Sequence, residues 1–574
     1  MKTIINSLYI FLLGLALQSC SKIGSITPDS VLFRQFEMNE WTIHLDGIWD
    51  THPYDQREIK VDLLFTDESG QTSILPCFYV SGESGKESIW KARFAPKNLG
   101  KNKLQIRLSQ KGEVIETKEY GTIIVESSSD HGILHIADNW AFTYDDSTAF
   151  RGIGENICWE SRDADDSKFF KALHEDSTRF NYDYMLSKLA KQGGNFFRMW
   201  MIYWNMPIDW KQPENNSRYT EAKNEFNESA MERMDHVVRL CDSLDIHMML
   251  ALDAHGSLLD RGWELSRYNA DNGGPAASPA EFFTNLEAKQ MYKDKLRLLV
   301  ARYGYSPSIA VWEFFNEIDN VLYADAAEGL RQEDITAWHQ EMAEYLKATD
   351  PYHHIITTSI SHRDIEGMND IKAMDLNQRH IYCAIPTIPA TIRSLEAKHQ
   401  KPYVIGEQGY HWDWSLNFND YEAEFAHDYR LALWLGLFSP TPILPMSWWW
   451  EFFEEKGTSD YLSVVRKVND LILEAGTGEI EEIECQKQDE TTALALRAGD
   501  KLFVYLHNDG EKAASLGTTI ITNGSSYQVS RISTDTGEIA ELGTVITQRN
   551  GSLFLPAEKL GSKQDVIYLL DLIK

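Results

Sequence analysis

The chain has 574 residues, of which 43% are hydrophobic and 12% aromatic, so it can form several domains with sizeable cores. It carries 55 Lys and Arg against 86 Asp and Glu, a formal net charge of −31. A molecule this acidic repels nucleic acids and anionic membrane surfaces, which favours a neutral ligand, although the same charge can also serve solubility alone.

The first twenty residues have the pattern of an export signal. Lys2 precedes an apolar run, 8–17, that is too short to span a bilayer. The run ends in Leu17-Gln18-Ser19-Cys20, which resembles the lipobox of bacterial lipoproteins. This resemblance implies a signal peptide at 1–20, lipidation of Cys20 and a protein anchored to the outer membrane, on its periplasmic or surface face. We expect residues 21–35 to be a tether.

Residues 36–126 consist of short segments in which apolar and polar residues alternate. Examples are 58–65 and 103–108, with turn residues between such segments. A period of two indicates strands, and their close spacing predicts an antiparallel β-sandwich.

Residues 135–476 change to apolar strands that alternate with helical periods, which indicates a parallel sheet with crossover helices. The chain ends, at 479–574, in a second set of alternating strands that predicts another sandwich. A doubly wound open sheet is the alternative for the middle region, but the number of strands and the length favour a (β/α)₈ TIM barrel, giving an α/β chain flanked by two sandwiches. The predicted barrel strands are 150–157, 195–201, 246–252, 309–315, 354–360, 379–383, 403–406 and 443–449.

Two glutamates follow predicted barrel strands at the point where each strand ends. Asn316-Glu317 closes the fourth strand and Glu407 closes the seventh. A lone glutamate in such a place is commonly only a charged strand cap. Two of them at one rim of a barrel are the carboxyl pair that cleavage of a glycosidic bond requires.

These segments resemble clan A glycoside hydrolases, especially family 5. In that family the Asn-Glu of the fourth strand supplies the general acid/base, and the seventh-strand glutamate is the nucleophile. The stretch 88–96 also resembles the immunoglobulin-like domain that precedes many bacterial glycoside hydrolase barrels. Further positions that are similar to the family's active site are Arg198, His255, His380, Tyr382, Trp448 and Trp450.

The resemblance implies a role for each residue. Glu317 must donate a proton to the leaving oxygen, while Glu407 must be ionised to attack the anomeric carbon. Arg198 and Tyr382 would hold Glu407 charged and oriented, and Asn316 would donate to the sugar 2-hydroxyl. Retention implies carboxyls about 5 to 5.5 Å apart, against roughly 6.5 to 9.5 Å for inversion.

Two roles are open for each of the other candidate site residues. His255 and His380 are expected to bind sugar hydroxyls or to brace the glutamates, and Glu155, after the first strand, either contacts substrate or is a structural hydrogen-bond partner. Trp204, and Trp448 with Trp450 on a shared strand face, could stack on a sugar. We expect no metal and no cofactor, because no H-x-H, H-E-x-x-H or C-x-x-C spacing occurs.

The sequence therefore predicts a retaining β-glycoside hydrolase that acts on plant-type or other β-linked oligo- or polysaccharides by double displacement. The alternative is a non-catalytic carbohydrate-binding envelope lipoprotein built on a retired barrel, although a binding module has no need of two opposed carboxyls. The predicted second-strand loop, 203–228, and the insert 260–272 would shape the cleft, so sugar identity, linkage and endo or exo action stay open.

Overall fold

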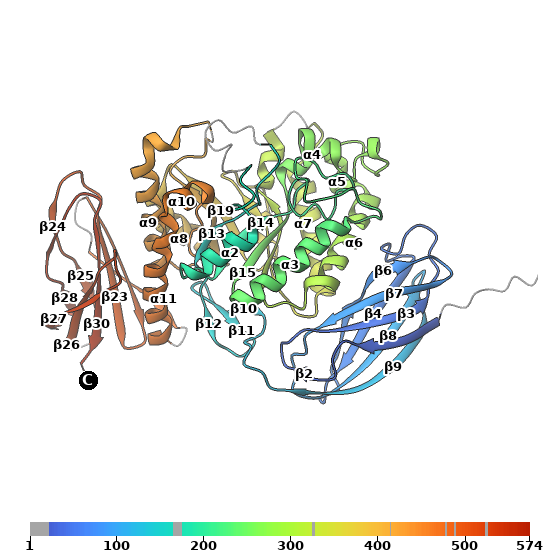
Figure 1. Cartoon of the computed structure of the whole chain (residues 1–574). Helices are drawn as coiled ribbons and strands as arrows, with labels where there is room; N and C mark the ends of the chain where they lie inside the picture. The colour runs from blue at the N-terminus through green and yellow to red at the C-terminus, as the bar shows by residue number, and fades with distance from the viewer. Residues whose placement is uncertain are drawn as a thin grey trace, which may run out of the picture.

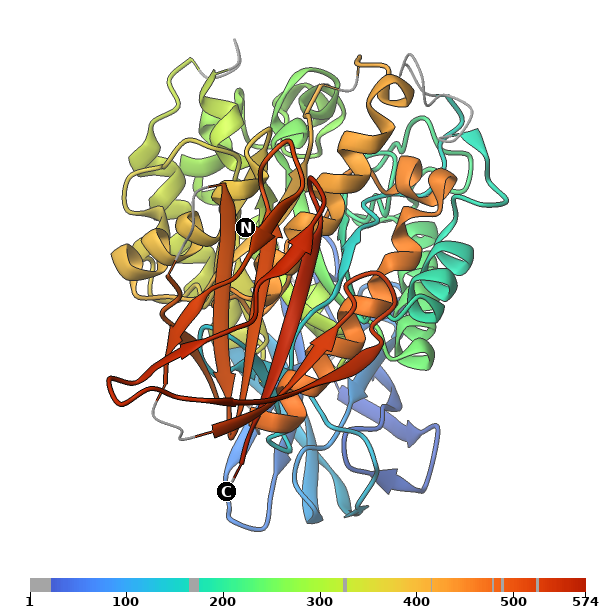
Figure 2. The ribbon, with the colours of Figure 1, turned by 90° about the vertical axis from the view of Figure 1, so that its left-hand side faces the viewer.

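The computed structural model describes residues 22–164, 175–323, 328–413, 415–476, 479–486, 490–522 and 526–573. These form the predicted (β/α)₈ barrel with one β-sandwich on either side (Figure 1). In Figure 2 the C-terminal sandwich lies in front of the barrel. Cys20 and the predicted signal peptide lie outside the described residues. Within those residues, no helix has the length and apolar character needed to cross a membrane.

The N-terminal sandwich consists of two sheets with strand orders β1-β3-β7-β6 and β2-β9-β8-β4-β5. Alternate residues of each strand point into the core; in β3, for example, Trp41, Ile43 and Leu45 are buried. The strands are β1 (Lys22–Pro28), β2 (Phe33–Arg34), β3 (Asn39–Asp46), β4 (Ile59–Thr66), β5 (Thr72–Pro76), β6 (Phe78–Gly82), β7 (Glu87–Phe94), β8 (Gly100–Gln110) and β9 (Glu113–Glu126).

The expected tether at 21–35 is wrong for the described part of that range. Strand β1 pairs with β3 from Lys22 onward, and β2 pairs with β9. Ile23 is fully buried in the sandwich core, as its apolar side chain favours. The folded domain therefore includes the chain from Lys22 onward.

Buried ion pairs join this sandwich to the helices of the barrel. Arg93 of β7 donates to both carboxylate oxygens of Asp235 in α3 (Glu228–Leu244), at 2.8 and 3.0 Å. Arg302 of α6 (Leu286–Tyr303) binds the same carboxylate at 2.9 and 2.8 Å. Because these charges are shielded from water, the pairs hold the two domains in one relative position.

The barrel strands run parallel in the order β13-β14-β15-β16-β17, continued by β18-β19-β20. β17 and β18 are two halves of the predicted fifth strand, interrupted at Thr358. The strands are β13 (Gly154–Asn156), β14 (Phe196–Trp200), β15 (His247–Ala254), β16 (Ile309–Asn316), β17 (Ile355–Thr357), β18 (Ser359–Ile360), β19 (Asn377–Tyr382) and β20 (Tyr403–Gly409).

The predicted eighth strand, 443–449, is not a regular strand. It makes isolated parallel bridges, Gly152 with Ile443 and both Glu155 and Gln408 with Ser447. Pro445 interrupts the ladder because it has no N–H to donate. The segment still closes the barrel, since the N–H of Leu444 donates to Gly152 and that of Met446 to Ile405.

Helices surround this barrel between successive strands, except between β18 and β19, where the described chain has only the short helix η5 (Met368–Asp370). Additional short helices after β15 and β16 lie at the rim where the strands end (Figure 1). The remaining helices are α2 (Tyr182–Lys191), η1 (His255–Leu258), α4 (Asp260–Leu265), η2 (Ala270–Asn272), α5 (Pro279–Thr284), η3 (Ile318–Tyr323), α7 (Gln332–Thr349), η6 (Ile385–Thr387), α8 (Ile388–His399), η7 (Phe418–Tyr421), α9 (Glu422–Leu437), α10 (Trp450–Lys456), η8 (Thr458–Tyr461) and α11 (Leu462–Gly476).

A small antiparallel sheet packs against the starts of the barrel strands. It consists of β10 (Leu134–Ile136), β11 (Phe142–Tyr144) and β12 (Ala149–Phe150). Its apolar side chains share a core with strand residues such as Phe196 and Val404. The opposite end of the barrel, where the strands finish, is therefore the end left for a site.

The C-terminal sandwich has a six-stranded sheet in the order β21-β22-β23-β30-β26-β27 and two strand pairs, β24-β29 and β25-β28. One set of its apolar residues forms a core of its own, whereas others, among them Leu496, Phe503 and Tyr505, belong to the hydrophobic cluster that includes the barrel core. Its strands are β21 (Ile480–Ile483), β22 (Thr491–Ala498), β23 (Lys501–Asn508), β24 (Ala514–Leu516), β25 (Thr519–Ile521), β26 (Ser526–Ile532), β27 (Ile539–Ile546), β28 (Ser552–Phe554), β29 (Glu558–Leu560) and β30 (Asp565–Leu572).

Candidate active site

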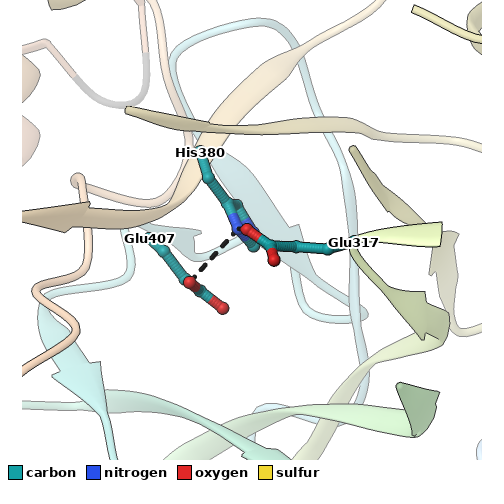
Figure 3. A group of neighbouring side chains, drawn as sticks. All are labelled: Glu317, His380 and Glu407. Carbon is teal, nitrogen blue, oxygen red and sulfur yellow. Dashed lines mark hydrogen bonds and ion pairs between the residues drawn. The ribbon is translucent and has the colours of Figure 1, made fainter. Parts of the chain in front are cut away.

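The two predicted glutamates meet at the rim where the barrel strands end. Glu317 follows β16, and Glu407 lies in β20. One carboxylate oxygen of each and a ring nitrogen of His380 all lie within 4.8 Å of one another. Figure 3 shows the two carboxylates approaching each other with the imidazole of His380 beside both. This spacing falls on the short side of the distances that separate retaining from inverting arrangements.

Glu317 occupies a left-handed backbone conformation, with φ of 49°. Such a conformation is unfavourable for a residue with a side chain, and it is typical of positions that a site requires. The hydroxyl of Ser359 accepts a 2.8 Å hydrogen bond from the Glu317 N–H, and the Asn320 amide donates to the carboxylate at 2.8 Å. These contacts fix both the backbone and the carboxyl of Glu317.

Glu407 is held as a carboxylate by two donors. Arg198 donates to Oε1 at 2.7 Å, and the Tyr382 hydroxyl donates to Oε2 at 2.7 Å. Burial alone would raise the pKa of Glu407, but His380, Arg198 and Tyr382 outweigh it and lower the pKa to about 2. Glu407 is therefore ionised and oriented at neutral pH.

His380 lies between the two glutamates. Its Nδ1 is 2.8 Å from Glu317 Oε1 and 3.2 Å from Glu407 Oε2. Burial favours the neutral imidazole, but the two carboxylates raise the pKa of His380 to about 9. At neutral pH the ring is positive, and its charge stabilises the ionised carboxylate of Glu407.

A buried ion pair lies beneath Glu407. Arg198 donates through Nε and one terminal nitrogen to both oxygens of Glu313, each at 2.7 Å, and both side chains are fully buried. The Arg198 guanidinium also donates to Asn156 at 3.1 Å and to Asn316 at 2.7 Å. These four partners, on the three strands β13, β16 and β20, thus define the orientation of Arg198 and, through it, of Glu407.

Glu313 and Asn156 are the site residues that sequence reasoning missed. Glu313 stands between Trp312 and Phe314 in an otherwise apolar strand, and its charge was the available signal, because a buried carboxylate needs a partner. Asn156 gave no such signal, since asparagine is common at strand ends.

Asn316 and His255 lie next to Glu317. The Asn316 oxygen accepts from Arg198, which turns its Nδ2 toward His255 Nδ1, 3.5 Å away. His255, the first residue of η1, has Nδ1 3.9 Å from Glu317 Oε2. Asn316 is fully buried, whereas His255 is partly exposed.

Tryptophans from three neighbouring segments form a cluster next to Arg198. Trp200 lies under the Arg198 guanidinium, 5.7 Å from its Cζ, and the ring of Trp448 is 5.1 Å from that of Trp200. Trp204 is half-buried and contacts Trp159, with ring centroids 6.0 Å apart. Trp448 is also half-buried, so part of its surface is free for a ligand.

The proposed pairing of Trp448 with Trp450 as two stacking surfaces is wrong. Trp450 is only 2% exposed and begins α10. Its ring packs edge-on against Trp448, with centroids 5.3 Å apart, and against Trp159. A helix begins at this point, so the alternation of side chains along a strand does not apply. Trp450 is a buried packing partner of Trp448.

Glu155 also does not join the site. Its neighbour Asn156 points toward Arg198, so strand alternation sends Glu155 outward to the helices. There it accepts hydrogen bonds from Tyr429 and Ser459 at 3.0 to 3.3 Å. Burial raises the pKa of Glu155 to about 8, so it is a structural hydrogen-bond partner, the second of its two readings.

Glu317, His380 and Glu407 are also the group of described side chains whose ligand atoms are close enough to share a metal ion. The surrounding charge disfavours that use. Arg198 already donates to Glu407 at 2.7 Å, and a dication on the same carboxylate would repel this fixed guanidinium. The set of contacts fits an acid–base pair better than a metal centre.

The comparison with known families agrees with this geometry. Residues 162–391 match the model of the family Cellulase (glycosyl hydrolase family 5). The matched range contains Arg198, His255, Glu317 and His380. The barrel is thus similar to glycosyl hydrolase family 5 over the matched residues.

The chain is similar in sequence to two curated mannan endo-1,4-beta-mannosidases and in fold to one solved structure. Mannan endo-1,4-beta-mannosidase A of Podospora anserina is 25% identical over 261 residues, covering 40% of this chain and 65% of that protein. Mannan endo-1,4-beta-mannosidase 3 of Oryza sativa subsp. japonica is 27% identical over 224 residues, covering 37% and 45%. The chain therefore spans less than two thirds of the length of either relative.

The solved structure is a Bacteroides vulgatus ATCC 8482 protein that is provisionally assigned to the glycoside hydrolases. It matches with a TM-score of 0.66 and 14% identity over 95% of this chain and all of that chain. At this identity the similarity concerns the fold, and it extends over both sandwiches as well as the barrel.

Proposed function

We propose that this protein is a retaining β-glycoside hydrolase with Glu317 as general acid/base and Glu407 as nucleophile. The observation that carries the proposal is the approach of their carboxylate oxygens to within 4.8 Å of each other, with His380 bridging them. A separation this short leaves no room for a water molecule between Glu407 and the anomeric carbon, which an inverting reaction would need.

In the first step, a Glu407 carboxylate oxygen attacks the anomeric carbon and forms a covalent glycosyl ester. The bond to the leaving oxygen breaks while Glu317 transfers its proton to that oxygen. Arg198 and Tyr382 keep Glu407 charged before the attack, and their hydrogen bonds orient the attacking oxygen.

In the second step, Glu317, now a carboxylate, takes a proton from water as that water attacks the same carbon. The ester bond to Glu407 breaks, and the product has the configuration of the substrate. Asn316 supports both steps, because its Nδ2 is free of the Arg198 contact and can donate to a hydroxyl of the bound sugar.

For the substrate, we propose a β-1,4-linked polysaccharide of the mannan type. Its support is the similarity to two mannan endo-1,4-beta-mannosidases, since the tryptophan cluster by itself would accept any neutral pyranose. A panel of β-1,4-linked manno-, gluco- and xylo-oligosaccharides, with product sizes and anomeric configuration followed by NMR, tests this. Release of β-anomers from manno-oligosaccharides is expected. Release of α-anomers would refute retention, and binding without turnover would favour the non-catalytic alternative.

We also propose that the protein is a lipid-anchored envelope protein. The support is the sequence Leu17-Gln18-Ser19-Cys20 after a short apolar run. Metabolic labelling with an alkyne fatty acid, followed by membrane fractionation, should detect the wild type in membranes. The Cys20→Ser variant should carry no label, and equal labelling of both forms would contradict the proposal.

A further inference from the structure

The barrel mouth has aromatic side chains on two opposite sides. The tryptophan cluster comes from β14 and from the segments after β13 and after residue 447. Tyr323 ends η3, which follows β16, and Arg363 follows β18. In an eight-stranded barrel the fourth and fifth strands lie across from the eighth and first. By this strand order, Tyr323 and the tryptophan cluster belong to opposite sides of the rim that carries Glu317, His380 and Glu407.

Tyr323 is an exposed aromatic residue with a defined orientation. Its side chain is 59% exposed, and the Cζ of Arg363 lies 3.5 Å from the centre of its ring. The guanidinium covers one face of the ring and restrains it by a cation–π contact. The opposite face is the one a ligand can use.

This pair is joined rigidly to the acid/base. Asp319, fully buried in η3, accepts hydrogen bonds from the N–H of Ser361 at 2.7 Å and of Arg363 at 3.3 Å. In the same helix, Asn320 donates to Glu317 at 2.8 Å. The proton donor Glu317 thus directly precedes this short helix, and the exposed ring of Tyr323 ends it.

We propose that Tyr323, backed by Arg363, is the binding platform for the sugar unit on the leaving-group side of the cleaved bond. This inference rests on the proposed function. The general acid must contact the leaving oxygen, so the leaving sugar lies on the side of the helix that begins next to Glu317. The tryptophan cluster beside Arg198 and Glu407 then holds the sugar whose anomeric carbon is attacked.

The chemistry of a pyranose fits this platform. The axial C–H groups of a sugar form an apolar face that packs on an aromatic ring, while its hydroxyl groups point outward. The guanidinium edge of Arg363 can donate to such hydroxyls from behind the ring. The ligand is thus a neutral β-linked pyranose, and the gain in affinity comes from a ring that needs no ordering on binding.

The first test measures binding without turnover. In a Glu407→Gln background, calorimetry should show that Tyr323→Ala weakens mannohexaose binding about tenfold, the size expected for loss of one aromatic contact. Tyr323→Phe keeps the ring and should match its parent. Tyr184→Ala, which removes an exposed tyrosine of α2, is the matched control and should also match. Equal affinity of all variants, or no binding by the parent, overturns the inference.

The second test separates the two sides of the cleft. Mannohexaose places sugars on both sides of the reactive carbon, whereas β-mannobiosyl fluoride places none on the leaving-group side. The kcat/KM ratio of mannohexaose to fluoride should fall about tenfold in Tyr323→Ala, with most of the change in KM. An unchanged ratio in an active enzyme refutes the platform alone, and a wild type that cleaves neither substrate refutes the proposed function.

Discussion

Arg198 and Glu313 form a two-point ion pair in which neither side chain is exposed to solvent. The pair lies one layer beneath the reacting groups, and Arg198 also donates hydrogen bonds to Glu407, Asn156 and Asn316. The position of the nucleophile therefore depends on a glutamate that does not contact it.

Removal of Glu313 should destabilise the protein. Glu313→Ala leaves a buried guanidinium with one carboxylate instead of two, and we expect a loss of about 3 kcal/mol or more in the free energy of unfolding. Glu313→Gln should lose less because it keeps the shape and one acceptor. Urea unfolding measures both. Arg331→Ala, which breaks the exposed pair with Asp334, is the control and should cost less than about 0.5 kcal/mol.

The two glutamates should be distinguishable by the stereochemistry of azide rescue. Glu407→Ala should lower kcat by about 10⁴-fold or more. Azide in the vacated space should then attack the anomeric carbon directly and give the α-glycosyl azide. Glu317→Ala should still form the ester from an activated aryl glycoside, and azide should displace Glu407 to give the β-glycosyl azide.

NMR of the isolated azides checks both assignments. Fluorescence spectra and unfolding midpoints close to wild type serve as the controls for folding. The same anomer from both variants, or wild-type rates in either one, would contradict the proposed roles.

His380 should make stability fall at alkaline pH. Its pKa is about 9 in the folded protein against an ordinary value of 6.5. A raised pKa gives stability that is fully present below about pH 6.5 and is lost as pH rises through 9. Relative to His380→Asn, the wild type should lose about 3 kcal/mol across this window. Urea unfolding at a series of pH values measures the difference, and parallel curves would refute a bridging imidazolium.

Glu155 should behave as a buried, neutral carboxyl. Its pKa of about 8, above an ordinary 4.5, gives stability that is present at low pH and is lost as pH rises from 4.5 through 8. Glu155→Gln should therefore match the wild type near pH 4 and be more stable above pH 8, with kcat/KM little changed at neutral pH. A large loss of activity in this variant would restore Glu155 as a substrate contact.

The sequence located the parts of the site that lie on regular strand ends. Glu317, Arg198, His380 and Tyr382 could be assigned because each lies in or directly after an apolar strand, and the family resemblance gave their order. Contacts between side chains on different strands could not be predicted in this way. Glu313 was visible only as a charge within an apolar run, and its partner depended on the register between β14 and β16.

The structural predictions were wrong where the local backbone departs from the regular alternation of side chains along a strand. Pro445 breaks the eighth strand, and a helix begins at Trp450, so face alternation failed there. At the N-terminus, the described part of the expected tether, 22–35, instead contains β1 and β2. β1 is held there by pairing with β3, and Ile23 is its one fully buried residue.

The early start of β1 bears on how the enzyme would meet its substrate. Two peptide units separate Cys20 from Lys22, a reach of about 7 Å at full extension. If Cys20 is lipidated, no long flexible linker would separate the lipid anchor from the folded domain. The N-terminal sandwich would then lie directly against the lipid headgroups. Soluble glycan chains would have to reach the active site at the membrane surface.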